Sequence, residues 1–565
     1  MLKNKSPGSD GLSVEFFQKF WPVFGRDYVE MINEIFNLET MSPSQRQAIL
    51  TLLYKDGEKE KIGNWRPISL LNTDYKILTK AIANRLRDKL KTIIHPDQTC
   101  GIKGRLIFEN IIFTKDAIFY ANKNNKPLAV ISIDQSKAFD RVNRNYLLKT
   151  LQKFGFGNNF IKWIKIIYTN TTSAICTNGH VSRTFLLTRG VRQGCPLSPL
   201  LYIIVAETMA NAIRLDDEIQ GFELPNNYET KLKCYADDTL VFLGDIKSIS
   251  ALFRLLDKYG KASESKLNVE KSKAMLTGTL KGSNEKNNCS VPLIFTDKLK
   301  VLGVWVGNGL VDVNADNWDK VMEKIQNALN MWKMRNLSVF GRALIVKSLA
   351  LSKLWYISRV EIMEQEKLND VEKKINEFIW YGKKQLVSTE KCKLDRLKGG
   401  LGLTDIATKC RTMRLQWLWK IYGNDNIENN DWRIMGRHFI DHVNQTVDNI
   451  EVSCIHMSYY KKSKHVPYFY IDLVETWKDM KFERKELQSR RDVLSEPLWS
   501  NPLIKFNGHL LNEIKWILAG LNTIKDIWSE DNLNFIDRVT MRNKIYTVIP
   551  TVTEIKISTK PMTKL

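Results

Sequence analysis

Residues 231–243 read KLKCYADDTLVFL, and the fold is organised around this stretch. Apolar and β-favouring residues flank Tyr235-Ala236-Asp237-Asp238 on both sides, which predicts two short strands joined by a tight acidic turn. Adjacent carboxylates repel each other, and burial raises their pKa further unless a cation neutralises them. A divalent metal is therefore one interpretation of the turn. Ordinary turn chemistry is the other, because Asp is common in turns of every function.

A second acidic strand favours the metal. Residues 128–134 read LAVISID, which predicts a buried strand that ends at Asp134. Between the two acidic strands lies a loop rich in Gly and Pro, residues 189–200 (RGVRQGCPLSPL). Two acid-ended strands and such a loop are the components of a two-metal nucleotidyl-transfer site, with Asp134, Asp237 and Asp238 as the metal ligands.

The composition is that of a folded and strongly basic protein. The chain has 565 residues, and such a length predicts about three or four domains. Apolar residues make up 43% and aromatic residues 10%, which excludes a disordered or collagen-like chain. The net charge of +23 either keeps the surface soluble or lines a groove that carries phosphates. We favour the groove, because the acidic strands already indicate a site that handles a polymer.

The cysteines and the apolar tracts argue against several protein classes. Eight cysteines without a Cys-x-x-Cys pair favour a reducing, intracellular compartment. The longest apolar tract, Leu197–Ile213, contains Glu207 and is shorter than the about 20 residues of a spanning helix. The N-terminus lacks a signal-peptide pattern, so we expect no membrane association. One group of residues resembles metal ligands but lacks the spacing of a zinc site, and we expect no zinc there: His438, Asp441, His442, Cys454 and His456.

Basic residues near residue 60 are candidates for binding a triphosphate. The predicted strand 49–54 opens onto a charged loop that begins at Lys55, and Arg66 follows directly before a proline. Arginine offers a planar fork of donors that suits phosphate oxygens. Taken alone, a solvated charged hairpin explains the same pattern more simply.

Three further residues are candidates for contacting a nucleotide. Phe139 follows Asp134 by a few residues and would lie under the sugar, where a bulky ring excludes a ribose 2′-hydroxyl. Gly194 lets backbone approach a substrate closely. Lys271, in the segment LNVEKSK, is a candidate proton donor to a departing pyrophosphate. The alternatives are a core phenylalanine, a common turn before a helix and a surface lysine.

Regions further from the acids carry weaker signals. Residues 14–24 and 28–38 predict two amphipathic helices, and residues 300–306 predict one strand. An apolar stripe from Trp318 to Trp332 indicates helix packing. Residues 459–491 interleave aromatic and basic side chains, which suits single-stranded nucleic acid and equally suits a basic surface over a small core. In a polymerase, a helical bundle of this kind would hold the nucleic-acid duplex through basic residues such as Arg342, Lys347 and Lys353.

Seven segments, taken together, resemble the reverse transcriptases of non-LTR, LINE-type retrotransposons. They are SPGSDGL, NWRPISLLN, IDQSKAFDRVN, GVRQGCPLSPLLY, YADD, LNVEKSK and VLGVWVG. The segments occur in the family's order within roughly the first 310 residues, and weaker similarity extends over nearly the whole chain. Group II intron maturases are a further related class, but the residues between the motifs resemble LINE elements more closely.

The resemblance implies an α+β fold of the right-hand polymerase type with a mainly helical C-terminal region. It implies fingers with part of the palm at residues 1–125, a palm at 126–310, a helical thumb at 311–385 and a C-terminal region at 386–565. The same resemblance implies a role for each matching residue. Asp134, Asp237 and Asp238 would bind metal and be catalytic, and Lys271 would be a catalytic proton donor. The residues that would bind the dNTP are Lys55, Arg66, Phe139, Gln193 and Gly194.

The reaction implied is DNA synthesis on an RNA template from a DNA primer and dNTPs. It uses two Mg²⁺ ions, for which Mn²⁺ is a substitute, and is expected in the cytoplasm and nucleus. The chain begins inside the first family motif, so we expect a fragment without the N-terminal endonuclease. A catalytically inactive RNA-binding remnant is the alternative. The segment Gln98-Thr99-Cys100-Gly101-Ile102 departs from the family pattern Gln-x-Gly-Phe.

Overall fold

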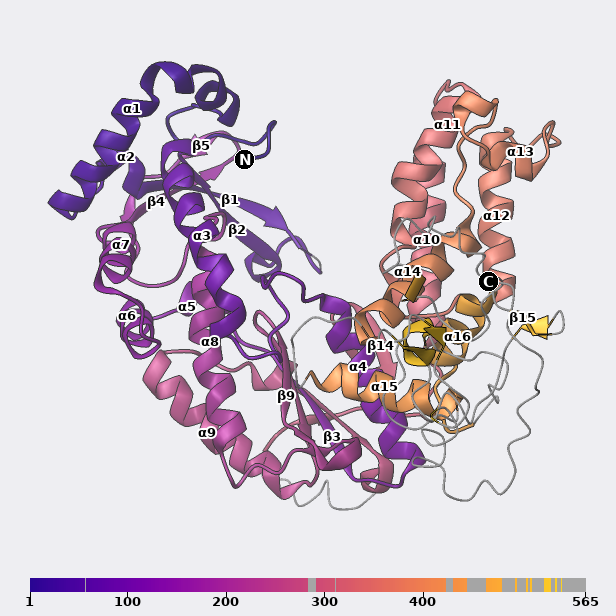
Figure 1. Cartoon of the computed structure of the whole chain (residues 1–565). Helices are drawn as coiled ribbons and strands as arrows, with labels where there is room; N and C mark the ends of the chain where they lie inside the picture. Colours follow the sequence, from indigo (N-terminus) through magenta and orange to yellow (C-terminus); the bar gives the residue numbers. More distant parts are fainter. Residues whose placement is uncertain are drawn as a thin grey trace. The chain divides into compact units, whose positions relative to one another are not determined.

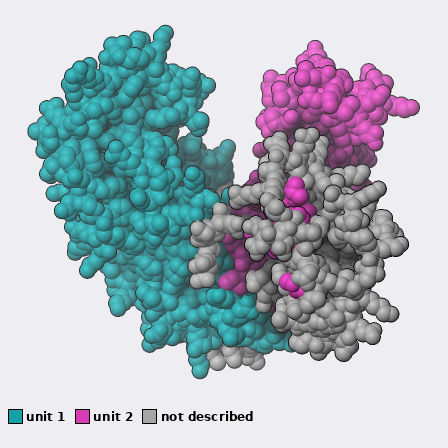
Figure 2. All heavy atoms as spheres, viewed as in Figure 1, with its two compact units in different colours: residues 1–317, 427–432 teal, residues 318–426, 433–565 magenta. Residues whose placement is uncertain are grey.

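The chain divides into two compact units, one of residues 1–317 and 427–432 and the other of residues 318–426 and 433–565 (Figures 1 and 2). Helices and mixed sheets occur together, which confirms the predicted α+β class. No helix in the described ranges has both the length and the apolar character needed to cross a membrane. The computed structural model describes residues 1–55, 57–282, 291–309, 311–422, 430–444 and 464–479, with short stretches at 493–494, 505–506, 509–510, 523–529, 534–535 and 540.

A five-stranded sheet in the first unit carries the acidic hairpin. Its strands are β3 (Leu128–Ile133), β9 (Leu232–Tyr235), β10 (Asp238–Leu243), β11 (Lys273–Thr277) and β12 (Ile294–Phe295). They lie in the order β12-β11-β3-β10-β9, and the central β3 pairs antiparallel with both β10 and β11. The predicted strand and the predicted hairpin are both confirmed.

Three helices cover the two faces of this sheet: α4 (Ile107–Lys123), α8 (Ser198–Leu215) and α9 (Lys247–Ser263). Successive strand residues point to opposite faces. Ile131 and Val241 therefore share one hydrophobic core with Ile213 of α8 and with residues of α9. On the other face, Phe242 packs edge-on against Phe113 of α4, with ring centroids 5.1 Å apart. Burial on both faces fixes the register of β3 against β10.

A second sheet of the same unit lies nearer the N-terminus of the chain. Its strands are β1 (Gln47–Tyr54), β2 (Trp65–Leu71), β4 (Thr172–Thr177), β5 (His180–Val181) and β6 (Phe185–Leu186). β1 pairs antiparallel with β2 and parallel with β4. The other helices of this part are α1 (Val14–Leu38), α2 (Pro43–Arg46), α3 (Thr73–Ile93), α5 (Ala138–Arg141), α6 (Arg144–Lys153) and α7 (Asn158–Tyr168).

Helix α1 is continuous, so the prediction of two separate helices is wrong. Gly25, which falls between the two predicted segments, is buried inside α1. The ring of Trp21 lies 3.0 Å from the place that a Cβ of Gly25 would occupy. The glycine thus lets an aromatic ring pack on the helix and does not end it.

The single strand predicted at residues 300–306 is also wrong, because the segment forms a hairpin. β13 (Lys298–Val301) pairs antiparallel with β14 (Val304–Gly307). Leu302 and Gly303 form the turn, with φ angles of 47° and 90°. Two positive φ angles are the signature of a type I′ hairpin turn. In the sequence these turn residues stand inside the run of residues 300–306, which predicts one strand.

The second unit is mainly helical. The stripe on α10 (Asn314–Lys333) is buried as predicted, since Trp318 and Ile325 have no exposed surface. The helices that follow are α11 (Val339–Ile345), α12 (Gln365–Ile379), α13 (Thr389–Lys393), α14 (Ile406–Tyr422), α15 (Asp431–Asn444), which starts in the first unit, and α16 (Tyr468–Asp479). Short strand pairs of this unit are β15 (Lys505–Phe506) with β16 (His509–Leu510) and β17 (Trp528–Ser529) with β18 (Asn534–Phe535), whereas β7 (Phe222–Glu223) pairs with β8 (Glu229–Thr230) in the first unit.

Arg342 is not available for the duplex contact suggested by the sequence. Its side chain is 1% exposed and donates to the carbonyl of Phe378 at 2.6 Å. Its guanidinium also lies over the ring of Tyr381, 3.3 Å from the centroid. Arg342 therefore holds helices of the second unit together, whereas Lys347 and Lys353 are exposed.

Some predictions fall outside the described residues. Cys454 and His456 are among them, as is most of the aromatic and basic segment 459–491. The division into fingers, palm, thumb and C-terminal region stays a prediction.

Candidate active site

The acidic residues lie at one end of the central sheet. The last pair in the ladder between β3 and β10 joins Ile133 to Thr239. The next residues in this register are Asp134 and Asp238, so both carboxylates emerge at the same sheet end. Ser272 fixes the backbone there, because the N–H of Asp134 donates to its hydroxyl oxygen at 3.2 Å.

The charges of these carboxylates act on one another. Burial raises the pKa of Asp237, and the charge of Asp134 raises it further. The pKa of Asp238 is raised to about 6 by desolvation, by Asp237 and by Asp134. The three acids predicted from distant segments therefore form one electrostatic unit with an excess of negative charge.

The donor chemistry of this unit fits a hard divalent cation. Carboxylate oxygens are the ligands that Mg²⁺ prefers, and a cation would offset both the desolvation and the repulsion that raise the pKa values of Asp237 and Asp238. Within the described part of the chain, no three His, Cys, Asp or Glu side chains stand in the arrangement of a formed metal site. The fit is therefore one of chemistry and charge, and the two Mg²⁺ ions stay a prediction.

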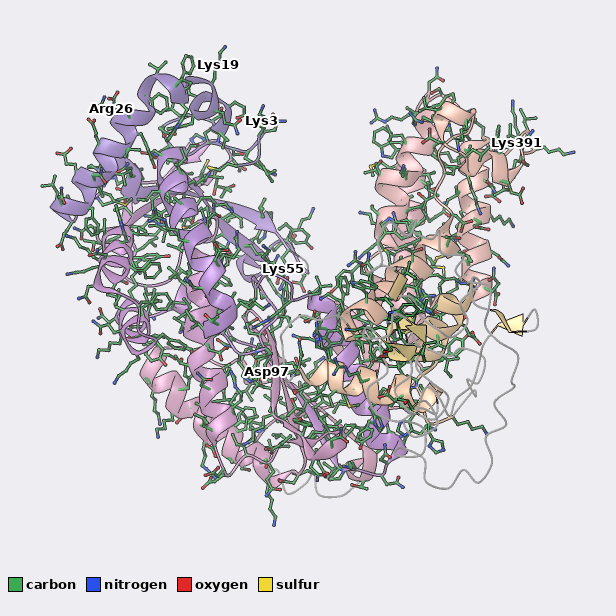
Figure 3. All side chains as sticks on the ribbon, viewed as in Figure 1. Lys3, Lys19, Arg26, Lys55, Asp97 and Lys391 are labelled. Carbon is green, nitrogen blue, oxygen red and sulfur yellow. The ribbon has the colours of Figure 1, made fainter. Side chains whose placement is uncertain are left out.

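Two predicted basic residues lie within electrostatic reach of the acids. Against the raising effects of burial and of neighbouring acids, the charges of Lys55 and Arg66 lower the pKa of Asp237 and of Asp238. Lys55 directly follows β1 (Figure 3). Its backbone N–H donates to the carbonyl of Asn64 at 2.9 Å. Arg66 lies in β2, and both side chains are exposed. The hairpin of β1 and β2 thus carries two exposed cations whose charges act on the acidic end of the central sheet.

Phe139 lies in the short helix α5, just after Asp134. Its half-buried ring stacks on Tyr202, with centroids 4.6 Å apart and planes 16° apart. The carbonyl of Phe139 accepts from the N–H of Val191 at 2.9 Å, which attaches α5 to the Gly-rich loop. The ring is held in one orientation, as both a sugar contact and a core residue require. Its role as a steric gate stays a prediction.

The Gly-rich loop is built against β2. Ser69 donates its N–H to the carbonyl of Gln193 at 2.8 Å. Gly194 has a φ of 117°, and a Cβ there would lie 2.5 Å from the carbonyl oxygen of Ser69, so only glycine fits. The amide Nε2 of Gln193 donates to Asp140 Oδ1 at 3.2 Å. A cavity of about 260 Å³ is lined by Ser69, Asp140, Gln193 and other residues of this loop.

Lys271 closes a short 3-10 turn (Val269–Lys271) beside the first acidic strand. Its N–H donates to the carbonyl of Asn268 at 3.2 Å, and the N–H of Asn268 donates to the carbonyl of Asp134 at 2.8 Å. The backbone of Lys271 is thus tied to the strand end that carries Asp134. Its side chain is exposed, and its role as proton donor stays a prediction.

Two polar residues at this site were not predicted from the sequence. Asp140 orients the amide of Gln193, and Gln98 bonds the backbone of Ala236 in the turn of the acidic hairpin. The only signal in the sequence for Asp140 is its place in the segment SKAFD. For Gln98 the sequence offers the segment Gln98-Thr99-Cys100-Gly101-Ile102, but its contact with Ala236 has no local signal because the two residues are 138 positions apart.

Solved structures with similarity to the chain include two polymerases. One is "Structure of telomerase from Candida Tropicalis in complexe with TWJ fragment of telomeric RNA", at 14% identity and a TM-score of 0.37 over 73% of this chain and 67% of that chain. Another is an RNA-dependent RNA polymerase of a human picorbirnavirus, at 12% identity and a TM-score of 0.35 over 60% and 59%.

Sequence relatives are more informative. The Transposon TX1 uncharacterized 149 kDa protein of Xenopus laevis is 32% identical over 95% of this chain and 41% of its own length. The Pol polyprotein from retrotransposable element R2 of Popillia japonica is 28% identical over 42% of this chain and 32% of its own length. A probable RNA-directed DNA polymerase from transposon BS of Drosophila melanogaster is 28% identical over 41% and 25%.

The chain thus spans less than half the length of each of these relatives. Residues 55–306 match the family model described as "Reverse transcriptase (RNA-dependent DNA polymerase)". This range contains the acidic strand, the Gly-rich loop and the acidic hairpin. The chain therefore carries a reverse transcriptase domain of the non-LTR retrotransposon type.

Proposed function

We propose that the chain is an RNA-directed DNA polymerase that extends a DNA 3′-hydroxyl on an RNA template. The observation that carries this proposal is that Asp134 and Asp238 emerge at one end of the central sheet, where the charges of Lys55 and Arg66 act on both hairpin acids. Nucleotidyl transfer needs both kinds of charged group, because acids that bind metal and cations that bind phosphate act on the same triphosphate.

Asp134, Asp237 and Asp238 would hold the two divalent cations. When bound, such cations lower the pKa of a primer 3′-hydroxyl and stabilise the charge of a departing pyrophosphate. Lys55 and Arg66 bind the triphosphate through charge-assisted hydrogen bonds. Their exposure in the free protein leaves their donors open to a ligand.

The remaining residues orient the nucleotide. The ring of Phe139 supports the sugar and rejects a 2′-hydroxyl, and Gln193 contacts the substrate from the Gly-rich loop. Lys271 supplies a proton to the leaving pyrophosphate. An RNA template, a DNA primer and dNTPs are the partners of this reaction, and a reducing compartment that includes the nucleus is where we expect it.

An inactive RNA-binding remnant is the competing function. It explains the net charge of +23 but gives no reason for three acids to share one sheet end. A remnant would bind RNA in a salt-sensitive way without extending a primer.

Primer extension tests the proposal. Wild-type protein with poly(rA), oligo(dT), dTTP and Mg²⁺ is expected to extend the primer, and Asp237→Asn is expected to abolish extension while RNA binding persists. Asp257→Asn is a matched control, because Asp257 is an exposed acid that pairs with Lys261 on the same helix. Wild-type protein that binds RNA but never extends a primer, with Mg²⁺ or Mn²⁺, would establish the remnant instead.

A further inference from the structure

We propose that Gln98 is a positioning residue that holds the turn of the acidic hairpin in its active shape. A buried ionic cluster centred on Asp97 anchors Gln98 against that hairpin. The inference rests on the proposed function, because the hairpin matters for catalysis only if Asp237 and Asp238 do. Gln98 itself contacts protein backbone and acts through the turn.

The turn of the hairpin needs outside support. Ala236 and Asp237 are its two central residues, since Tyr235 pairs with Asp238 across the strands. Ala236 has a φ of 56°, in the left-handed region that an L residue with a Cβ disfavours. A hairpin turn with positive φ at its first central residue normally has glycine there. The alanine therefore keeps this conformation only because neighbouring groups enforce it.

The side chain of Gln98 provides that support. Its Oε1 accepts from the N–H of Ala236 at 2.9 Å, and its Nε2 is 3.4 Å from the carbonyl oxygen of the same residue. Oε1 also accepts from the N–H of Cys100 at 3.1 Å, which fixes the orientation of the amide. Gln98 is only 3% exposed. One buried side chain thus satisfies both polar groups of the strained residue.

The main chain around Gln98 is attached to the same hairpin. Cys234 in β9 donates its N–H to the carbonyl of Asp97 at 2.9 Å and accepts from the N–H of Thr99 at 3.0 Å. Residues 97–99 therefore run parallel to β9 along its free edge, with Gln98 opposite Cys234. This pairing sets the distance between Gln98 and the turn two residues further on.

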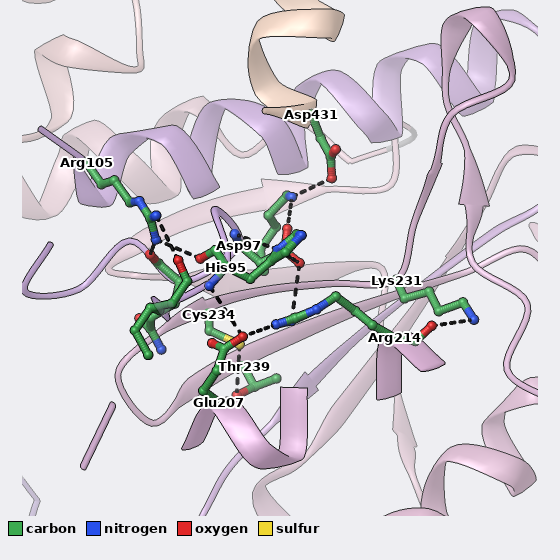
Figure 4. Close-up of polar contacts among 12 residues, drawn as sticks. His95, Asp97, Arg105, Glu207, Arg214, Lys231, Cys234, Thr239 and Asp431 are labelled. Atoms are coloured by element: carbon green, nitrogen blue, oxygen red, sulfur yellow. Dashed lines mark hydrogen bonds and ion pairs between the residues drawn. The ribbon is translucent and has the colours of Figure 1, made fainter. Parts of the chain in front are cut away.

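A cluster of buried charges holds residues 97–99 in place (Figure 4). Asp97 Oδ1 lies 2.5 Å from Lys233 Nζ, which also lies 2.5 Å from Asp431 Oδ2. Asp97 Oδ2 lies 2.8 Å from Nδ1 of His95. Lys233 precedes Cys234 in β9 and is 4% exposed. The carboxylate next to Gln98 is thus paired with a strand residue of the hairpin.

Arg105 also holds the segment of residues 95–98. Its Nη1 donates to the carbonyls of His95 at 2.7 Å and Gln98 at 2.8 Å. Arg214 and Glu207 form an ion pair beside Asp97, and Arg214 Nη1 lies 3.9 Å from Asp97 Oδ2. The segment therefore has few ways to move relative to β9.

The test separates a positioning role from a purely structural one. Gln98→Met keeps the volume of the side chain and removes all three hydrogen bonds. Ala236→Gly removes the conformational strain that Gln98 opposes. If Gln98 acts through the turn, the second substitution compensates for the first; a general loss of packing would not be repaired by glycine at residue 236.

Two measurements are made on the full chain. Primer extension on poly(rA) and oligo(dT) gives kcat and the KM for dTTP, and hydrogen exchange with mass spectrometry follows the Ala236 and Asp237 amides. Gln98→Met is expected to lower kcat about 100-fold with little change in KM, because a catalytic group misplaced by a small distance loses rate and not affinity. It is also expected to expose the Ala236 amide to exchange. The double variant Gln98→Met/Ala236→Gly is expected to recover kcat about tenfold.

Asn122→Leu is the matched control. Asn122 in α4 is another amide that bonds loop backbone: its Oδ1 accepts from the N–H of Gly278, just after β11, at 3.1 Å and its Nδ2 donates to the carbonyl of Asn308 at 3.0 Å. The control is expected to lower stability without changing kcat or exchange at residues 235–238.

Unchanged exchange at Ala236 in Gln98→Met would overturn the inference, as would a double variant no more active than Gln98→Met. If the wild-type protein extends no primer, the proposed function fails, while the exchange of Ala236 still decides whether Gln98 holds the turn.

Discussion

Asp140 Oδ1 accepts a hydrogen bond from Gln193 Nε2 at 3.2 Å, which joins the helix after the first acidic strand to the Gly-rich loop. Burial raises the pKa of Asp140, and the bond from Gln193 opposes this shift. The pair lines a cavity of about 260 Å³ together with Ser69. Two segments of the candidate site are thus oriented by one contact.

The first prediction concerns this pair. Asp140→Leu is expected to raise the KM for dTTP about five- to tenfold with a smaller effect on kcat, because one oriented hydrogen bond is worth about 1 kcal/mol. Asp140→Asn keeps an acceptor oxygen and is expected to remain near the wild-type value. Steady-state primer extension measures both. Equal KM values for the leucine and asparagine variants would remove Asp140 from substrate binding.

Phe139 provides the second prediction. Phe139→Ala is expected to admit ribonucleotides, because removing the ring opens space for a 2′-hydroxyl. The readout is the ratio of kcat/KM for dTTP and UTP on poly(rA). Phe156→Ala is the control: Phe156 is also half-buried, stacks on Phe160 at 4.9 Å and packs against the same core. If both variants discriminate like wild type, Phe139 is an ordinary core residue.

The third prediction concerns the buried cation of the ionic cluster. Lys233→Met leaves the carboxylates of Asp97 and Asp431 without their 2.5 Å partner. We expect a loss of about 3–5 kcal/mol in the free energy of unfolding, because both carboxylates lose the cation between them and Asp97 keeps only His95 and the more distant Arg214. Chemical denaturation measures this loss. The exposed pair of Lys261 and Asp257 supplies the comparison, since Lys261→Met should change stability little. Equal effects of the two substitutions would contradict the account.

The pH dependence of stability gives the fourth prediction. Burial alone would raise the pKa of Asp97, but Lys233, His95 and Arg214 lower it below the ordinary value. A folded-state pKa below the unfolded one means that the unfolded chain binds the proton first on acidification. The stability from Asp97 is therefore present above about pH 4 and is lost as the pH falls below it. Denaturation of wild type and Asp97→Asn from pH 7 to pH 3 should show their difference shrinking, and a constant difference would argue against an ionised Asp97.

The sequence predicts the parts of the fold that follow from local patterns. β3 and the acidic hairpin were correctly expected because their apolar residues must be buried on both faces of a sheet. The hairpin at residues 298–307 cannot be predicted from local pattern, because Leu302 in its turn is apolar like the strand residues on either side. The turn shows only in the backbone, where Leu302 has a φ of 47°. The two helices predicted at residues 14–24 and 28–38 are one helix, in which Gly25 leaves room for the ring of Trp21.

The residues of the candidate site also fall into those that a local sequence pattern predicts and those that it does not. Asp134, Asp237 and Asp238 carry a signal of their own, since an acid at the end of an apolar strand is unusual. The contacts of Gln98, Asp140 and Ser272 cannot be predicted in this way, because each is made with a partner far away in the chain. Arg342 lies on a predicted helix, where a basic side chain is expected to be exposed, but it is buried because its guanidinium bonds the carbonyl of Phe378.

The central claim is that Asp134 and the hairpin acids bind one pair of divalent cations. A crystal structure with primer, RNA template, dTTP and Mn²⁺ tests it directly through the anomalous signal of manganese. We predict two peaks about 4 Å apart, both coordinated by carboxylate oxygens of Asp134 and Asp237. Peaks bound elsewhere, or an Asp134 carboxylate outside the coordination sphere of both ions, would contradict the account.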